Sequence, residues 1–361
     1  MKTIGAVALL MLFFITTQAQ KTFLVGGKVI DSATLQPLAG ASVFAQNTTQ
    51  GTLSDSAGIF IMRLPNGGYD LVISYTGYET KSLRISNTQP PGDSIIILLA
   101  QANKTLEEVA VVASNEVEDG WNQFGKFFID NFIGTTPNAA YCTIQNPTAL
   151  RFFYTKNKKR HRLKVIAKED VIVQNDALGY TVRYQLDSFS YDYNSNISQY
   201  TGYPFFIEKD TTPEVKDEWK KNRARTYLGS RLHFMTALYD SIVTDEGFSV
   251  EKMDANMKNK GDLITDLYDS TLYRTDSTNT VEIAWDGSYR VSYKNVMPDQ
   301  KFLKEFKLPA NSRMQVTLLD VTGGFFIEEN GYFYEQSDVV NTGYWAWKKL
   351  AEALPYDYVY E

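Results

Sequence analysis

The chain has 361 residues, of which 43% are hydrophobic and 22% are charged, and this composition is typical of folded globular domains. Its formal net charge of −6 disfavours a nucleic-acid partner, because the phosphates of DNA and RNA call for a basic protein face. The length indicates two domains, and the single cysteine, Cys142, excludes an internal disulfide.

Residues 1–20 have the pattern of a signal peptide. Lys2 supplies the positive end, residues 4–15 form the apolar core, and residues 17–19 provide a small-residue cleavage site. The apolar run is shorter than the ~20 residues that cross a bilayer. We therefore expect an exported protein, periplasmic or associated with the outer membrane or cell surface, with no transmembrane segment in the mature chain.

Residues 21–103 contain short apolar runs that are separated by turn residues. The runs are TFLVGGKVI, ASVFA, GIFIMRL, YDLVISYTGY, KSLRIS and SIIILLA. Gly, Pro, Asn and Asp occupy the breaks, and this arrangement predicts a small all-β sandwich. Within residues 69–75 apolar positions alternate, which is typical of a strand with one fully buried face.

Five motifs support this sandwich prediction. They are G-x-V-x-D at 27–31, P-L-x-G-A-x-V at 37–43, T-x-x-D-x-x-G-x-F at 52–60, L-P-N-G-x-Y at 64–69 and S-Y-x-G-Y at 74–78. Together they resemble the carboxypeptidase regulatory-like domain, a prealbumin-like sandwich common at the N-terminus of exported Bacteroidetes proteins. The resemblance implies a seven-stranded β-sandwich.

The enzymes that give this domain its name carry it beside a zinc peptidase. A zinc site needs about four nitrogen, oxygen or sulfur donors in tetrahedral geometry. The chain has only two histidines, His161 and His233, and neither has a glutamate three residues on. We expect no peptidase, no metal and no cofactor.

Residues 104–118 are the predicted linker. The run LEEVAVV at 106–112 is similar to the segment that follows the same domain in TonB-dependent outer-membrane receptors, where it leads to a 22-stranded barrel. Such a barrel needs roughly 220 residues in strands alone. Only 246 residues follow position 115 (361 − 115), and several of them read as helices, so we expect no barrel. The run is either the exit of the sandwich or a docking signal for a TonB-linked system.

Residues 119–361 predict an α+β domain with an antiparallel sheet and a few helices. A helix is predicted where Trp121, Phe124, Phe128 and Phe132 recur at intervals of three and four. Strands are predicted at 149–155, 162–167, 180–187, 189–193, 203–208, 280–285, 289–293, 314–321, 325–328 and 332–336.

Three further segments of this domain have a distinct character. We expect the basic hairpin tip at 156–162 to be exposed to solvent. The alternative is that it binds a phosphorylated glycolipid headgroup. Residues 252–280 are polar and predict a loop-rich excursion. Residues 344–358 predict a short helix that Pro355 ends, followed by an aromatic tail that docks on its own domain.

The candidate ligand-binding residues lie where two helices are predicted to meet, Pro213–Tyr227 and residues 230–243. They combine cationic, aromatic and imidazole side chains: Trp219, Arg223, Tyr227, Arg231 and His233. Read functionally, they form a cleft for an acidic or sugar ligand with arginines as forked donors. Read structurally, which we favour, Gly229 shapes the corner and the arginines pack on aromatic faces.

These patterns lead to three hypotheses of function. The first is a non-catalytic cell-envelope protein, whose sandwich is joined to a domain that binds a protein partner or a glycan. The second is a cryptic hydrolase of glycan or peptide that uses two carboxylates of the second domain, which an acidic pair in one cleft with a raised pKa would favour. The third is an accessory of a TonB-linked uptake or secretion system.

Overall fold

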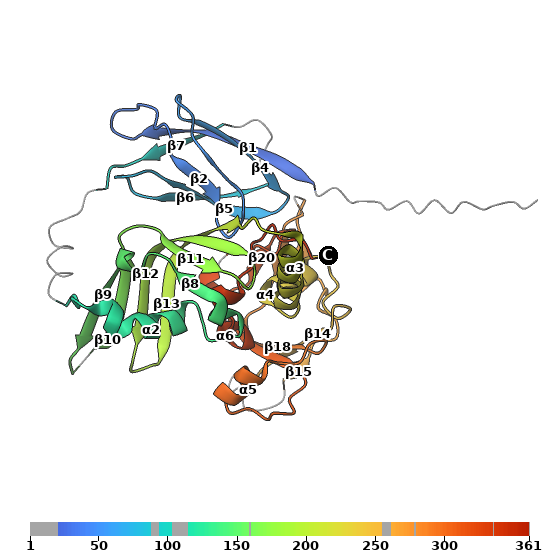
Figure 1. The fold of residues 1–361 in the computed structure, drawn as a ribbon. Coiled ribbons are helices and arrows are strands. Elements are labelled where there is room, and N and C mark those ends of the chain that lie inside the picture. The colour runs from blue at the N-terminus through green and yellow to red at the C-terminus, as the bar shows by residue number, and fades with distance from the viewer. Residues whose placement is uncertain are drawn as a thin grey trace, which may run out of the picture.

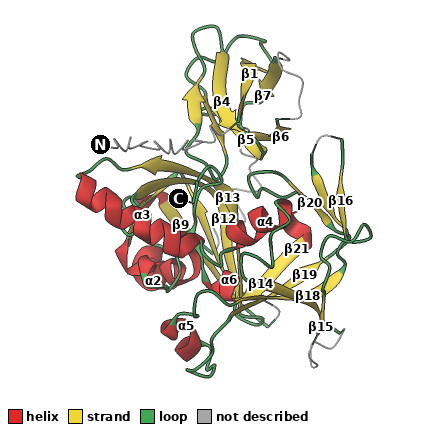
Figure 2. Ribbon diagram, turned by 90° about the vertical axis from the view of Figure 1, so that its right-hand side faces the viewer, coloured by secondary structure: helices red, strands yellow, loops and turns green. Residues whose placement is uncertain are grey.

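The computed structural model describes residues 21–87, 94–102, 115–158, 160–254, 261–277, 279–334 and 336–360. The predicted signal peptide and the run at 106–112 lie outside these residues. The fold is mainly β, and the described strands form five sheets (Figures 1 and 2). The predicted mainly β class, with an N-terminal sandwich followed by an α+β region, is confirmed.

Seven strands form the N-terminal sandwich, as predicted. One sheet has the order β4-β1-β7, from β1 (Thr22–Asp31), β4 (Ile59–Pro65) and β7 (Ile95–Leu99). The other has the order β3-β2-β5-β6, from β2 (Ser42–Ala45), β3 (Gly51–Leu53), β5 (Gly68–Ser74) and β6 (Lys81–Ser86). Strand β3 was not among the apolar runs, because its three residues GTL give no periodicity.

Strand β5 is buried on both faces, whereas its alternation predicted one. Tyr69, Leu71 and Ile73 fill the sandwich core. Val72 points the opposite way and is also fully buried, as is the neighbouring Phe44 of β2. Phe44 packs against Phe205 with ring centroids 5.3 Å apart, so the α+β region covers this outer face.

A six-stranded sheet follows the sandwich. Its strands are β8 (Cys142–Ile144), β9 (Leu150–Lys156), β10 (His161–Ala167), β11 (Val171–Asn175), β12 (Tyr180–Asp192) and β13 (Ile197–Glu208). Helix α2 (Gly120–Phe132) packs Phe128 and Phe132 into its core, so the predicted aromatic stripe faces its own domain. The two strands predicted at 180–187 and 189–193 are one strand with an irregularity between Leu186 and Ser188.

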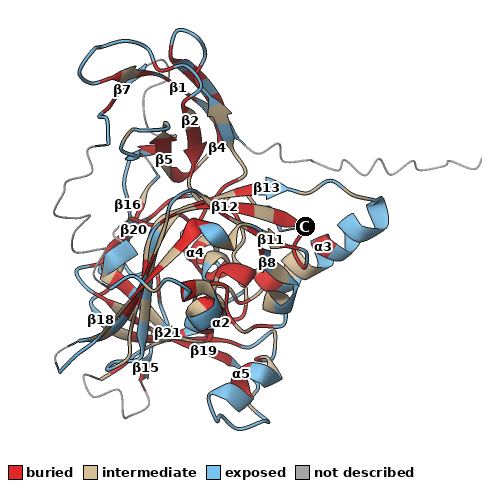
Figure 3. Ribbon diagram, turned by 60° about the vertical axis from the view of Figure 1, so that its left-hand side comes forward, coloured by how far each residue is buried: buried red, intermediate tan, exposed pale blue. Residues whose placement is uncertain are grey.

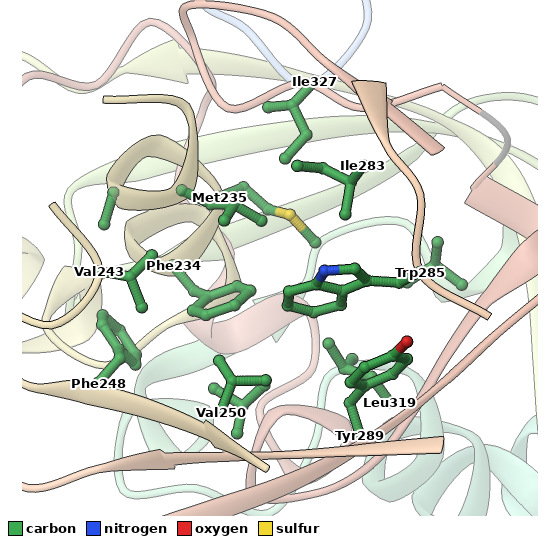
Figure 4. Packing of buried hydrophobic residues seen from close by; sticks show 14 of the residues in the cluster. Phe234, Met235, Val243, Phe248, Val250, Ile283, Trp285, Tyr289, Leu319 and Ile327 are labelled. Atoms are coloured by element: carbon green, nitrogen blue, oxygen red, sulfur yellow. The ribbon is translucent and has the colours of Figure 1, made fainter. Parts of the chain in front are cut away.

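A second core lies beyond the helices α3 (Pro213–Tyr227) and α4 (Arg231–Tyr239). Five of its strands form the order β15-β14-β18-β19-β21: β14 (Phe248–Lys252), β15 (Asp262–Leu263), β18 (Gly287–Tyr293), β19 (Gln315–Val321) and β21 (Val339–Gly343). Three more form β16-β17-β20: β16 (Tyr273–Thr275), β17 (Val281–Ile283) and β20 (Phe325–Ile327). Phe234 of α4, Trp285 and Tyr289 meet at its centre (Figure 4).

Two predictions for the C-terminal third were wrong. The described residues of the strand predicted at 332–336 form no strand: Phe333 makes an isolated bridge to Ile327, and Gln336 begins the 3₁₀ turn η3 (Gln336–Asp338). The predicted C-terminal helix is divided into α6 (Tyr344–Trp347) and the 3₁₀ turn η4 (Leu350–Glu352). The break sends Trp347 and Leu350 into different hydrophobic clusters.

The remaining described helices are short. Helix α4 ends at Tyr239 rather than near residue 243. Helix α5 and three 3₁₀ turns were not predicted: α5 (Gln300–Glu305), η1 (Asn138–Tyr141), η2 (Pro147–Ala149) and η3 (Gln336–Asp338).

The aromatic tail was predicted to dock on its own domain, but it also binds the sandwich. The amide of Tyr356 donates to the carbonyl of Asn47 at 2.7 Å. The carboxylate of Asp357 accepts from the amide of Thr49 at 3.0 Å and from the side chain of Gln50 at 2.9 Å. The tail therefore links the sandwich to the α+β region.

Two acids with raised pKa values also lie where the sandwich meets the α+β region, which we call the joint. The Tyr332 hydroxyl donates to Asp70 at 3.0 Å, and burial raises the pKa of Asp70. The Glu328 carboxylate accepts from the hydroxyl of Tyr334, and burial raises the pKa of Glu328 above its usual value of 4.5.

We expect Glu328→Gln to stabilise the fold at pH 7.5 and to have no effect of this origin near pH 4. A buried acid with a raised pKa keeps its proton to higher pH in the folded state than in the unfolded state. Its contribution to stability is therefore present below the unfolded pKa and is lost as pH rises through the folded pKa. Urea unfolding at both pH values measures this difference. Glu329→Gln, at the exposed neighbouring residue, is the control, and an equal effect of Glu328→Gln at both pH values would contradict the prediction.

Candidate ligand cavity

A cavity of about 840 Å³ lies where six parts of the chain meet. Its walls come from the sandwich loop at Gln46 and Asn47, from strands β12 and β13, from the start of α4, and from residues 331–341 and 345–356. This volume is within the range of small-molecule sites, which favour junctions between domains. We therefore take this cavity as the candidate ligand site.

Six aromatic side chains contribute to the walls. They are Tyr184, Tyr200, Tyr203, Phe333, Trp345 and Tyr356. The rings of Tyr184 and Tyr200 are fixed by edge contacts to Phe132 at 5.0 and 5.2 Å. Burial raises the pKa of both tyrosines, so their hydroxyls stay neutral and can donate hydrogen bonds. Amides of Gln46, Asn47, Gln336 and Asn341 add polar groups.

Arg231 is the cation at the start of α4. Its guanidinium lies 5.4 Å from the centre of the Phe333 ring and donates to Asn341 Oδ1 at 3.5 Å. Within the part of the chain that the structure describes, no carboxylate forms an ion pair with it. Its positive charge opposes the effect of burial on the pKa of both Tyr200 and Tyr356.

Two lysines contribute to another wall. Lys348 Nζ donates to the carbonyl of Thr226 at 3.3 Å, and Lys349 Nζ donates to that of Asn131 at 2.9 Å. Burial lowers the pKa of both lysines, and the charge of Glu352 opposes this effect at Lys348. Glu352 also accepts from the Thr226 hydroxyl at 3.2 Å.

The structure places Trp219 and Arg223 away from this cavity. Trp219 is buried and its indole donates to the Asp176 carbonyl at 2.8 Å. Arg223 donates to the Leu178 carbonyl at 2.7 Å, and its guanidinium lies 4.0 Å from the centre of the Tyr180 ring. Both side chains hold helix α3 against the turn between β11 and β12.

Tyr227 and His233 occupy the corner between α3 and α4. The Tyr227 hydroxyl and Thr236 Oγ1 are 2.8 Å apart. His233 Nδ1 accepts from the Gly229 amide at 3.0 Å, and its Nε2 lies 3.0 Å from a Glu246 oxygen. Burial lowers the pKa of His233, although Glu246 opposes the shift. Of the five predicted residues, only Arg231 lines the cavity.

Comparison with known proteins supports the N-terminal domain alone. The model of the CarboxypepD_reg-like domain matches residues 25–111, a range that contains β2 to β7 and most of β1. No curated protein matches the chain. The match ends before the cavity's main walls, so it assigns no role to them.

Two solved structures share limited similarity with the chain. A chain of a mutant type II cohesin–X-dockerin complex from Acetivibrio cellulolyticus is 20% identical over 26% of this chain and 73% of that chain, with a TM-score of 0.20. A 9R-lipoxygenase from Cyanothece is 9% identical over 68% of this chain and 51% of that chain, with a TM-score of 0.14. Such low TM-scores carry no functional argument.

Two searches of the described residues bear on other classes of site. No described helix is long and apolar enough to cross a membrane. Among the same residues, no three His, Cys, Asp or Glu side chains are grouped so that they could hold a metal ion.

Proposed function

We propose that this chain is a non-catalytic cell-envelope binding protein whose cavity holds a glycan with an acidic group. The observation that carries the proposal is the cavity of about 840 Å³ with tyrosine walls and one arginine that has no acidic partner among the described residues. Tyrosine rings offer stacking faces for sugar rings, and their hydroxyls and the nearby amides suit sugar hydroxyls. Arg231 offers a planar fork for a carboxylate, sulfate or phosphate.

Two features of the sequence support the proposed envelope setting. The signal-peptide pattern of residues 1–20 and the regulatory-like domain at 25–111 both favour an exported protein, periplasmic or at the outer membrane, of Bacteroidetes type. A TonB-linked partner remains a narrower prediction, carried by residues 106–112 alone. Deleting residues 104–113 tests it: loss of partner capture from crosslinked envelopes with folding intact supports docking, and loss of folding supports a structural strand.

We expect Arg231→Gln to weaken binding of an acidic glycan by about 10- to 100-fold, the equivalent of one charge-assisted hydrogen-bonding group. An array of acidic and neutral glycans, probed with residues 21–361, identifies the ligand, and calorimetry measures the change. Arg225→Gln, an exposed arginine on α3, is the matched control. Equal weakening by both variants would show a general charge effect, and an array with no hits would refute the proposal.

The hydrolase hypothesis retains one supporting observation. Asp187 and Glu352 both line the cavity, and burial raises the pKa of Asp187. A glycosidase needs two carboxylates with unequal proton affinity across the scissile bond. Mass spectrometry of array hits after incubation decides between binding and hydrolysis. Cleavage that Asp187→Asn and Glu352→Gln each abolish would replace the binding proposal.

A further inference from the structure

The outer face of the β4-β1-β7 sheet is aliphatic and exposed. Alternate residues of each strand fill the sandwich core, and the residues between them point outward. Five outward side chains are large and aliphatic, with exposed fractions from 43% to 68%: Leu24, Ile59, Ile61, Ile96 and Leu98. We call these five residues the aliphatic face.

The strand register places the aliphatic face on three neighbouring strands. Gly26 lies opposite Ile61, and Lys28 lies between Ile59 on one side and Ile96 on the other. Directly opposed residues on neighbouring strands have Cβ atoms roughly 4.5–5.5 Å apart. The aliphatic side chains therefore share one face of three adjacent strands, with Lys28 between Ile59 and Ile96. An exposed face rich in large apolar side chains marks an interaction site.

In the other sheet of the sandwich, by contrast, the outer face is covered by protein. The outward side chains Phe44 and Val72 of β2 and β5 are buried because the α+β region packs on them. The β4-β1-β7 sheet lies on the opposite side of the sandwich, at the end of the molecule away from that region (Figures 1 and 3). A flat surface can approach this end without touching the α+β region.

The charges on this sheet point to the nature of the partner. Lys28 and Arg63 are the only charged residues among the outward positions of the three strands, in a chain whose net charge is −6. Within the described residues neither has an ion-pair partner, and Arg63 donates only to the Thr22 hydroxyl at 3.1 Å. A basic and aliphatic surface complements an anionic lipid leaflet: the aliphatic groups enter the acyl boundary and the cations reach the phosphates.

We propose that the aliphatic face, with Lys28 and Arg63, docks the protein on the surface of an anionic lipid leaflet. A second copy of the chain is a poorer occupant, because a two-fold contact centred on this face would bring the Lys28 charges of both copies together. The proposal is independent of the cavity and of its ligand. It makes the sandwich the part of the molecule that contacts the membrane surface.

Vesicle flotation with residues 21–361 tests the proposal. We expect binding to vesicles that contain phosphatidylglycerol, and much weaker binding to vesicles of phosphatidylcholine alone. Ile61→Thr with Ile96→Thr should lower binding by roughly tenfold or more, because both apolar insertions are lost while strand propensity is kept. Lys28→Glu should lower binding to the anionic vesicles specifically.

The matched control is Ile197→Thr with Leu263→Thr, which changes two aliphatic residues of similar exposure on other sheets. Circular dichroism and the melting temperature must show that each variant is folded. The proposal is overturned if the chain does not bind anionic vesicles, or if both double variants lose binding equally. It is also overturned if sedimentation shows a dimer that Ile61→Thr with Ile96→Thr dissociates while vesicle binding is absent.

Discussion

Replacing Trp285 with alanine is expected to lower the free energy of unfolding by about 3–5 kcal/mol, the cost of removing a large aromatic side chain from a packed core. Trp285 is fully buried in the core that α4 shares with two sheets. It stacks on Tyr289 with centroids 4.6 Å apart (Figure 4). It also meets Phe325 edge-on at 6.2 Å. Helix α4 begins at Arg231, so loosening this core should also weaken ligand binding at the cavity.

Trp285→Phe is the informative control. The indole N–H of Trp285 is buried and has no hydrogen-bond acceptor among the described residues. Phenylalanine leaves a smaller cavity and also removes this unsatisfied donor, which offsets part of the lost packing. Urea unfolding should therefore show a much smaller loss for Trp285→Phe than for Trp285→Ala. Equal losses would show that the indole N–H is satisfied or that the site collapses around either side chain.

Replacing Asn330 with alanine is expected to cost about 2–5 kcal/mol, because it leaves both peptide groups of a buried glycine without partners. Asn330 Oδ1 accepts from the Gly68 amide at 3.2 Å, and its Nδ2 donates to the Gly68 carbonyl at 3.0 Å. The side chain thus imitates a β-ladder partner for the end of strand β5. A Cβ at Gly67 would lie 2.3 Å from the Asn330 side chain, so this side chain packs directly against the backbone of the turn.

Calorimetry can distinguish a loss of contact between the sandwich and the α+β region from a loss of stability within their cores. We expect Asn330→Ala to separate the unfolding of the sandwich from that of the α+β region, giving two transitions where the parent chain gives one. Asn66→Ala is the control, because its amide donates at 3.3 Å to the exposed Glu329, and it should change stability by no more than about 0.5 kcal/mol. A single transition with unchanged midpoint in Asn330→Ala would show that the contact contributes nothing to the joint.

The predictions that succeeded depended on local patterns. Alternation and turn residues suffice for β1, β4 and β5, since a hairpin's register follows from neighbouring residues. The same holds for α2 and α3, whose aromatic spacing and first-turn proline are visible within one helix. The burial of Val72 was missed because its cover, the α+β region, lies far away in the sequence.

The cavity could not be predicted from spacing. Arg231, Tyr200 and Lys348 belong to a helix start, a strand and a tail that no short motif connects. The corner from Trp219 to His233 carried the stronger sequence signal, yet four of its five candidates lie outside the cavity. Cationic and aromatic residues on two adjacent helices also serve to pack those helices on a sheet. Composition alone therefore does not distinguish a ligand site from internal packing.

The contact between the tail and the sandwich sets an order of assembly. Strands β1 to β7 can pair as soon as residue 99 has been synthesised, because all their ladder partners lie within residues 22–99. The partners of Thr49 and Asn47, however, are Asp357 and Tyr356, about 300 positions later. Until those residues arrive, the loop at 47–50 lacks these hydrogen-bond partners. A chain cut short before residue 356 would thus carry a finished sandwich without this contact, so the contact itself distinguishes a complete chain from a truncated one.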